Sequence, residues 1–140
     1  MRVTDAAGGF LLALADRDFQ RLATCLAPDV RFRVVLSAES REHRGRQAAT
    51  DLFERWFGPV SALELVRAER GEVAGHERLA WRVRVRDRLG KPGWQLVEQV
   101  AYCDLGAQGI QTINLLCSGF RAEPAPHDGK GTAILDKLFP

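Results

Sequence analysis

Two side chains near the middle of the sequence could carry acid–base chemistry, Glu98 and Tyr102. The strand register derived below makes Glu98 the only carboxylate on an otherwise apolar sheet face. Burial of that kind raises the pKa of a carboxyl group and can make it a general acid or base. Tyr102 falls on the same face and would donate a hydrogen bond to a ligand oxygen. Each also has a structural interpretation: Glu98 as the partner of an arginine or a backbone donor, and Tyr102 as an ordinary core tyrosine.

The other reactive residue types do not gather in a recognisable pattern. His43, His76 and His127 share no metal-ligand spacing with each other or with the cysteines, so we predict neither a metal site nor a cofactor. Cys117 falls on the apolar face, but no histidine is placed to activate it as a nucleophile. The cysteines are odd in number and lack disulfide spacing, which indicates free thiols in a reducing cytosol.

The stretch 78–120 must position Glu98 and its neighbours. It contains three alternating runs separated by two glycine-bearing turns, which is typical of a three-stranded antiparallel meander. We pair Leu89 with Trp94 across the first turn and Leu105 with Ile110 across the second. Directly paired residues lie on the same side of a sheet. Besides Glu98, the resulting apolar face carries Trp81, Val83, Val85, Val100, Tyr102, Ile113, Leu115 and Cys117.

The opposite face of this meander mixes basic, polar and apolar residues. Its members are Arg82, Arg84, Arg86, Val97, Gln99, Ala101, Thr112, Asn114, Leu116 and Ser118, and Arg88 continues the basic row. The apolar members among polar neighbours predict a moderately polar homodimer interface. The net charge of +2 gives no reason to expect nucleic acid or an anionic membrane as a partner.

Shorter elements precede the meander. The expected elements are a helix to about Ala15, a short helix from Asp18, a strand at 30–36, a helix ending near Phe57 and a long strand at 63–73. Residues 1–121 would form one domain, and 122–140 would be a proline- and glycine-rich tail. The tail ends in an apolar segment at 132–139, which we predict to be helical and to cover a barrel opening or a partner subunit.

The composition indicates a soluble globular protein. Of 140 residues, 46% are hydrophobic and 27% are charged, which is ordinary for that class. No apolar run approaches the ~20 residues that a membrane-spanning helix needs. The first residues lack a basic segment followed by an apolar one, so we expect no signal peptide and a cytoplasmic location.

The chain resembles the NTF2-like superfamily over about residues 6–121. The residues that carry the resemblance are the runs LALADRDFQRLATCLAPDVRF, HRGRQAATDLFERWF and GIQTINLLCSGFR. The superfamily includes ketosteroid isomerases, SnoaL-type polyketide cyclases and scytalone dehydratase. The resemblance implies an α+β fold, in which three helices lie on the concave face of a cone-shaped, curved antiparallel sheet, a half-barrel. It also implies a pocket between sheet and helices, and frequent dimers.

Three functions remain open on this resemblance. The first is binding of a small, largely apolar ligand, with Glu98 and Tyr102 as polar anchors. The second is a cyclase, isomerase or dehydratase (a lyase) acting on a small hydrophobic substrate, with Glu98 as acid or base. The third is a dimerisation module whose cavity is filled. The expected pocket residues are Phe10, Phe32, Val34, Phe53, Trp56, Trp81, Val83, Val100, Ile113, Leu115 and Cys117.

The residues depart from the ketosteroid isomerase pattern. Val34 stands where the resemblance would place the catalytic base, and Phe10 stands at the oxyanion-hole tyrosine. The second oxyanion acid falls near Gln99, one position from Glu98. The histidine pair of scytalone dehydratase is not visible either. An isomerase of that design is therefore not expected.

Overall fold

The computed structural model describes residues 5–36 and 39–123 of the chain. The apolar segment predicted at 132–139 lies outside these ranges. The elements in chain order are α1 (Ala6–Asp16), α2 (Phe19–Thr24), β1 (Leu26–Val35), β2 (Ser40–Arg44), α3 (Arg46–Phe57), β3 (Ala62–Val73), β4 (His76–Arg86), the 3₁₀ turn η2 (Arg88–Gly90), β5 (Trp94–Gly106), β6 (Gly109–Cys117) and β7 (Arg121–Ala122).

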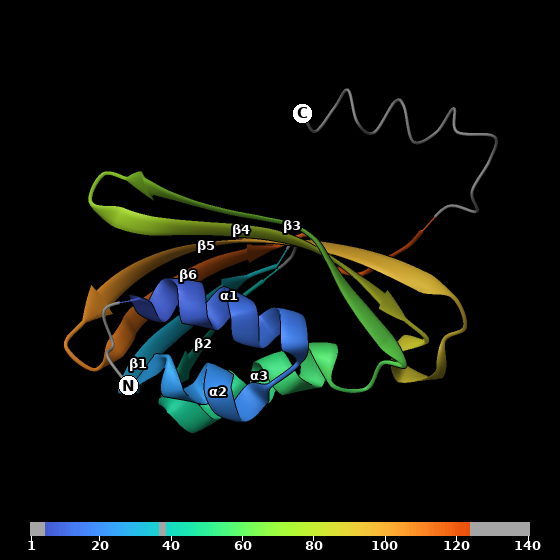
Figure 1. Cartoon of the computed structure of the whole chain (residues 1–140), viewed down its shortest axis with the longest axis horizontal. Helices are drawn as coiled ribbons and strands as arrows, with labels where there is room; N and C mark the ends of the chain where they lie inside the picture. The colour runs from blue at the N-terminus through green and yellow to red at the C-terminus, as the bar shows by residue number, and fades with distance from the viewer. Residues whose placement is uncertain (1–4, 37–38, 124–140) are drawn as a thin grey trace.

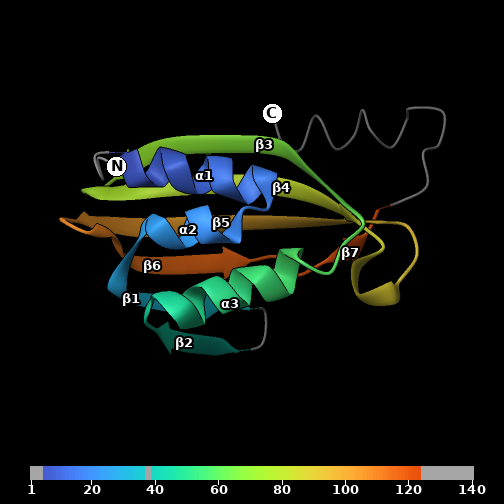
Figure 2. The same ribbon diagram turned by 60° about the horizontal axis from the view of Figure 1, so that its bottom comes forward.

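The strands form one curved, unclosed sheet in the order β2-β1-β6-β5-β4-β3, and β7 pairs with β5. All pairs are antiparallel except β1 with β6, which run parallel. The three helices lie side by side on the concave face (Figure 1, Figure 2). The predicted α+β architecture is confirmed, and two layers enclose one apolar interior.

Side-chain caps fix the first turns of α1 and α2. The Asp5 carboxylate accepts a hydrogen bond from the Gly8 N–H at the start of α1, and Asp18 does the same for the Arg21 N–H at the start of α2. Arg17, with φ of 52°, ends α1 in the left-handed conformation. The buried stripe of α3 consists of Ala49, Thr50, Leu52, Phe53 and Phe57.

The connection between β4 and β5 differs from the predicted turn and reverses the faces of β5. Arg86, rather than Leu89, pairs with Trp94. This displacement is an odd number of residues, so every side chain of β5 moves to the other face of the sheet. Trp81 consequently pairs with Gln99.

A β-bulge near the end of β5 displaces the second pairing as well. Leu105 pairs with Ile110 as predicted, but the register shifts between Asp104 and Leu105, and Asp104 pairs with Thr112. This displacement is also odd, so the two cancel and β6 keeps its predicted facing. The meander residues that face the helices are Leu79, Trp81, Val83, Val85, Val97, Gln99, Ala101, Cys103, Ile113, Leu115 and Cys117.

The predicted facing was therefore wrong for every residue of β5 in the sheet. Glu98, Val100 and Tyr102 lie on the outer face, where each is only partly buried. Val97 and Ala101, which we expected on a dimer interface, are buried inside, with at most 1% of their surface exposed. The outward-facing apolar residues are instead Leu96, Val100 and Leu116, together with Ala80 and Val35. The homodimer stays a prediction, and light scattering at micromolar concentration would test it.

Candidate functional site

Glu98, the predicted acid or base, is held in an ion pair on the outer face. Its Oε1 accepts a hydrogen bond from Arg82 Nε at 2.7 Å, and its backbone N–H donates to Ser118 Oγ at 2.9 Å. Tyr102 lies on the same face, between its register partners Arg78 and Asn114. The structure thus brings neither residue into the interior, and Glu98 has the structural partner considered as the alternative.

The pair between Arg82 and Glu98 is expected to contribute about 1 kcal/mol to stability. The Glu98 side chain is 35% exposed and that of Arg82 is 19% exposed, so water screens their attraction. Glu98→Gln should lower the free energy of unfolding by that amount in a urea titration, and less at high salt. Glu72→Gln, on an exposed carboxylate of β3 with no ion pair among the described residues, is the control. A loss of 3 kcal/mol or more would show instead that the pair behaves as fully buried.

A row of polar side chains crosses the concave face. Trp81, Gln99 and Cys117 occupy one register row of β4, β5 and β6. Gln99 is 1% exposed, and its Oε1 accepts a hydrogen bond from Trp81 Nε1 at 2.7 Å. Its Nε2 donates to Cys117 Sγ at 3.3 Å, and the Gly119 N–H donates to the same sulfur at 3.4 Å. A buried amide needs such partners, because an unpaired one would cost a few kcal/mol.

Arg88 closes this region at the C-terminal end of α3. Its Nε donates to the Trp56 carbonyl at 2.9 Å, and its guanidinium lies 3.7 Å from the centre of the Phe120 ring. Burial lowers the pKa of Arg88, and attraction to Cys117 partly opposes that effect. The sequence placed Arg88 in an outward basic row, but η2 turns the chain away from the strand direction. The buried Gln99 and the partly buried Arg88 are thus two polar residues of this region that sequence reasoning missed.

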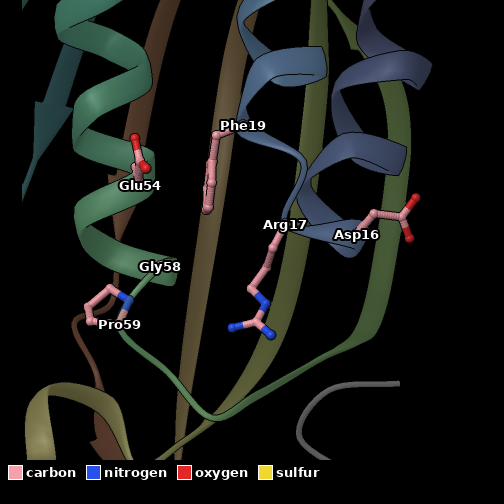
Figure 3. Close-up of a pocket in the computed structure, with 6 residues that line it drawn as sticks. All are labelled: Asp16, Arg17, Phe19, Glu54, Gly58 and Pro59. Atoms are coloured by element: carbon pink, nitrogen blue, oxygen red, sulfur yellow. The ribbon is translucent and has the colours of Figure 1, made fainter.

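An open cleft of about 570 Å³ interrupts the helix layer. It lies where α1 ends, α2 begins and α3 ends, and Arg17 and Phe19 extend into it (Figure 3). Its lining residues are Asp16, Arg17, Phe19, Glu54, Gly58 and Pro59. Arg17 also donates to the Val60 carbonyl at 2.9 Å, and Phe19 packs against the buried core. Charged side chains and the edge of the apolar core, at Phe19, thus meet in this cleft.

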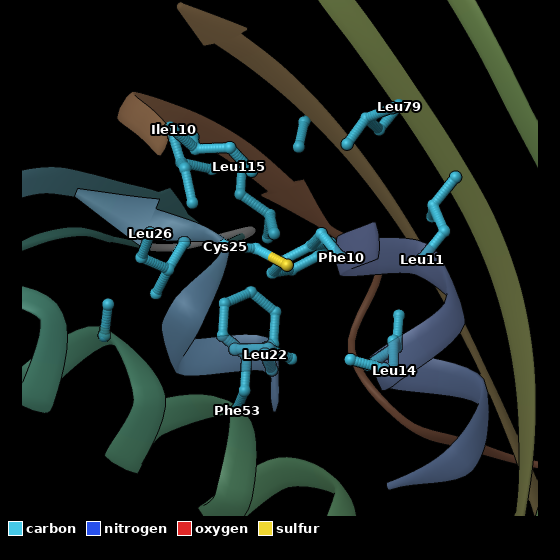
Figure 4. Close-up of a cluster of buried hydrophobic side chains, with 14 of the residues drawn as sticks. Phe10, Leu11, Leu14, Leu22, Cys25, Leu26, Phe53, Leu79, Ile110 and Leu115 are labelled. Carbon is cyan, nitrogen blue, oxygen red and sulfur yellow. The ribbon is translucent and has the colours of Figure 1, made fainter. Parts of the chain in front are cut away.

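Ten of the eleven predicted pocket residues lie between the sheet and the helices. They are Phe10, Phe32, Val34, Phe53, Trp56, Trp81, Val83, Ile113, Leu115 and Cys117, whereas Val100 lies outside. Figure 4 shows three of them, Phe10, Phe53 and Leu115, within the cluster of buried apolar side chains. Ring contacts connect Phe10, Phe53 and Trp56 at centroid distances of 5.2 and 5.3 Å. Much of the interior is thus filled by aromatic side chains.

The outer face has a smaller hollow, of about 290 Å³. It is lined by Arg31, Phe32, Arg33, Glu42, Asp104, Thr112 and Asn114. At its end the Asp104 carboxylate accepts hydrogen bonds from Thr112 Oγ1 (2.7 Å) and pairs with His76 Nδ1 (2.6 Å), contacts that lower the pKa of Asp104. Within residues 5–36 and 39–123, no three histidine, cysteine or acidic side chains lie close enough to hold a metal ion.

Residues 7–107 match the family model of the SnoaL-like domain. The chain belongs to the SnoaL-like family. No curated protein matches this SnoaL-like chain at a significant level. Within the described residues, no helix is long and apolar enough to span a membrane.

Solved structures share the SnoaL-like fold at low sequence identity. A protein of Shewanella denitrificans, provisionally named a SnoaL-like polyketide cyclase, is 14% identical with a TM-score of 0.61, over 97% of this chain and 96% of that one. A Kribbella flavida protein provisionally named a ketosteroid isomerase is 17% identical, with a TM-score of 0.56 and coverages of 93% and 86%. An NTF2-like protein of Burkholderia xenovorans is 13% identical, with a TM-score of 0.63 and coverages of 84% and 89%.

We expect the thiol of Cys103 to make this SnoaL-like domain less stable as the pH rises above neutrality into the alkaline range. Burial raises the pKa of Cys103 to about 12 from its ordinary value of 9.0. As the pH rises, the unfolded chain therefore loses the Cys103 proton before the folded protein does. The contribution of this thiol to the free energy of unfolding is fully present below pH ~9 and is lost as the pH rises toward ~12. Urea titrations from pH 9 to 11 should show a steeper loss of stability for the parent than for Cys103→Ala. Parallel curves would contradict the prediction.

Proposed function

We propose that this SnoaL-like protein binds a small, predominantly apolar molecule between the helix layer and the concave face of the sheet. The observation that carries the proposal is the hydrogen-bonded row Trp81–Gln99–Cys117 on the concave face. Ligand pockets combine apolar walls with a few placed polar groups that fix the orientation of the ligand. The apolar residues around the row, including Val83 and Leu115, would supply such a wall.

The cleft beside Phe19 supports a route for that molecule. Phe19 is only partly buried, so its ring can move at a lower cost than those of the fully buried phenylalanines. The aromatic cluster of α1 and α3 limits the space, which favours a ligand of one or two rings over a large one. The charged rim, including Arg17 and Glu54, keeps the entrance hydrated while the interior stays apolar.

The chemistry of the row favours binding over repeated proton transfer. An indole N–H and a carboxamide do not titrate near neutral pH, so Trp81 and Gln99 can orient a ligand but cannot serve as an acid or base. Glu98, which we considered for that role, lies on the outer face in its pair with Arg82.

The test measures binding of N-phenyl-1-naphthylamine, a neutral apolar fluorescent dye, and native mass spectrometry looks for a co-purified ligand. We expect saturable dye binding to the parent. Cys117→Phe places a ring beside Gln99 and should abolish that binding. Leu116→Phe introduces the same phenylalanine ring at the neighbouring residue. Leu116 is 50% exposed on the outer face, so this variant should leave the binding unchanged. Thermal melts check that both variants fold.

Two results would contradict the proposal. One is the absence of saturable binding to the parent. The other is equal binding to the parent and to a folded Cys117→Phe variant, which would place the dye elsewhere on the protein.

A further inference from the structure

Arg88 differs from the other arginines of β4 and its following turn in how its charge is balanced. Four residues earlier, Arg84 contacts two carboxylates, Glu64 at 2.8 Å and Glu123 at 2.9 Å. Within residues 5–36 and 39–123, Arg88 pairs with no carboxylate, and the hydrogen bond found for it is the one from Nε to the Trp56 carbonyl. A guanidinium carries five N–H donors, so the Nη groups of Arg88 retain donor capacity.

The surroundings of Arg88 leave its charge and its Nη donors only partly compensated. One side of its guanidinium is covered by the Phe120 ring at 3.7 Å, and the group is partly removed from water. An uncompensated cation in such a place is costly, and the carbonyl at the end of α3 compensates it only in part. Arg88 on the β4–β5 connection thus holds a charge for which the described residues offer no anion.

Cys117, which interacts electrostatically with Arg88, is itself approached by two N–H donors. Gln99 Nε2 and the Gly119 N–H both point at Cys117 Sγ, at 3.3 and 3.4 Å. A thiol sulfur is a weak acceptor, so these two N–H donors share one poor hydrogen-bond partner. An oxygen anion that entered this region would be a better partner for the same donors.

We propose that Arg88 receives the carboxylate of the bound molecule, so that the ligand is a small aromatic or aliphatic monocarboxylic acid. The carboxylate accepts hydrogen bonds from the Arg88 Nη groups at the end of α3, because a guanidinium offers paired donors that match a carboxylate. The apolar body of the acid lies along the concave face toward Trp81. This inference rests on the proposed function and specifies its ligand class.

The test compares three naphthalene compounds that differ in charge: 2-naphthoic acid, 2-naphthalenemethanol and 2-naphthylmethylamine. Each displaces N-phenyl-1-naphthylamine from the parent protein at pH 7.5. We expect the acid to bind about tenfold more tightly than the alcohol, a difference of about 1.4 kcal/mol, and the amine to bind most weakly. This comparison needs no variant and therefore does not depend on whether a substitution at Arg88 folds.

Variants then assign the preference to Arg88. Arg88→Gln should reduce the advantage of the acid over the alcohol to less than twofold. Arg88→Lys, which keeps the charge but loses the fork, should retain part of the advantage. Arg55→Gln, at an exposed arginine of α3, is the matched control and should keep the full preference.

The outcomes separate this inference from the proposed function. If the dye binds and the acid and the alcohol displace it equally, the ligand class is wrong and the binding function stands. If a folded Arg88→Gln variant still prefers the acid, another cation receives the carboxylate and the inference is overturned. If the dye does not bind to the parent, the proposed function fails and the inference fails with it.

Discussion

Replacing Phe53 with alanine is expected to lower the free energy of unfolding by about 3–5 kcal/mol. Phe53 is fully buried, and its ring lies 5.2 Å from that of Phe10 and 5.1 Å from that of Phe32. It therefore connects α3 with α1 and with β1. Removing the ring leaves a cavity that these rigid elements can fill only in part. Because the free energy of unfolding of a domain is about 5–15 kcal/mol, this single substitution removes a large fraction of it.

Urea denaturation followed by circular dichroism measures this loss. Leu12→Ala is the control, because Leu12 is 57% exposed on α1 and its truncation should change stability by no more than about 0.5 kcal/mol. If Phe53→Ala costs less than about 1 kcal/mol, the interior around α3 is loosely packed and holds more free space than its ring contacts indicate.

Gly109→Ala is expected to cost about 3 kcal/mol or more. Gly109 begins β6 with φ of +117°, a conformation that side-chain-bearing residues rarely adopt, and such strain alone costs about 1–3 kcal/mol. A Cβ atom there would also lie 2.6 Å from the carbonyl oxygen of Cys25. That oxygen accepts a hydrogen bond from the Ile110 N–H at 2.9 Å, so relieving the clash disturbs the contact between β6 and the end of α2.

Gly90→Ala isolates the strain from the clash. Gly90 has φ of +76°, and nothing lies within 4 Å of a Cβ atom built there. Its replacement should cost about 1–2 kcal/mol, which is the backbone term alone. Thermal and urea unfolding of the two variants give the difference. Equal losses would mean that the backbone near Cys25 moves aside at no cost, and would contradict the argument.

The facing of β5 could not be predicted because its own pattern is ambiguous. Val97 and Ala101 on one face match Val100 and Tyr102 on the other, so alternation alone does not choose the buried side. The choice depends on the geometry of the flanking connections, and both differed from a simple hairpin. The helix stripes were predictable, because Phe10 and the apolar positions of α3 recur at helical spacing among polar residues.

The residues of the candidate site were likewise predicted only in part. Trp81 and Cys117 were placed correctly, since the two register errors cancel between β4 and β6. Gln99 was missed together with the face of β5. Arg88 was missed because it continues an alternating arginine row, whereas η2, with Asp87 and Leu89 at positive φ, directs it toward α3. The glycines that follow Arg88 were the available signal that the strand ends before it.

The parallel pairing of β1 with β6 has a consequence for how the chain folds. Phe32 meets its register partner Ile113 only after almost the whole domain has been synthesised. Closing so long a loop costs entropy before any contact compensates for it, so this pairing should come late and limit the folding rate. During synthesis on the ribosome, we expect the aromatic rings of β1 and α3 to stay exposed to solvent until β6 has left the exit tunnel and can pair with β1. A chain that ends before β6 therefore exposes the first half of its core, and chaperones and proteases should recognise that half.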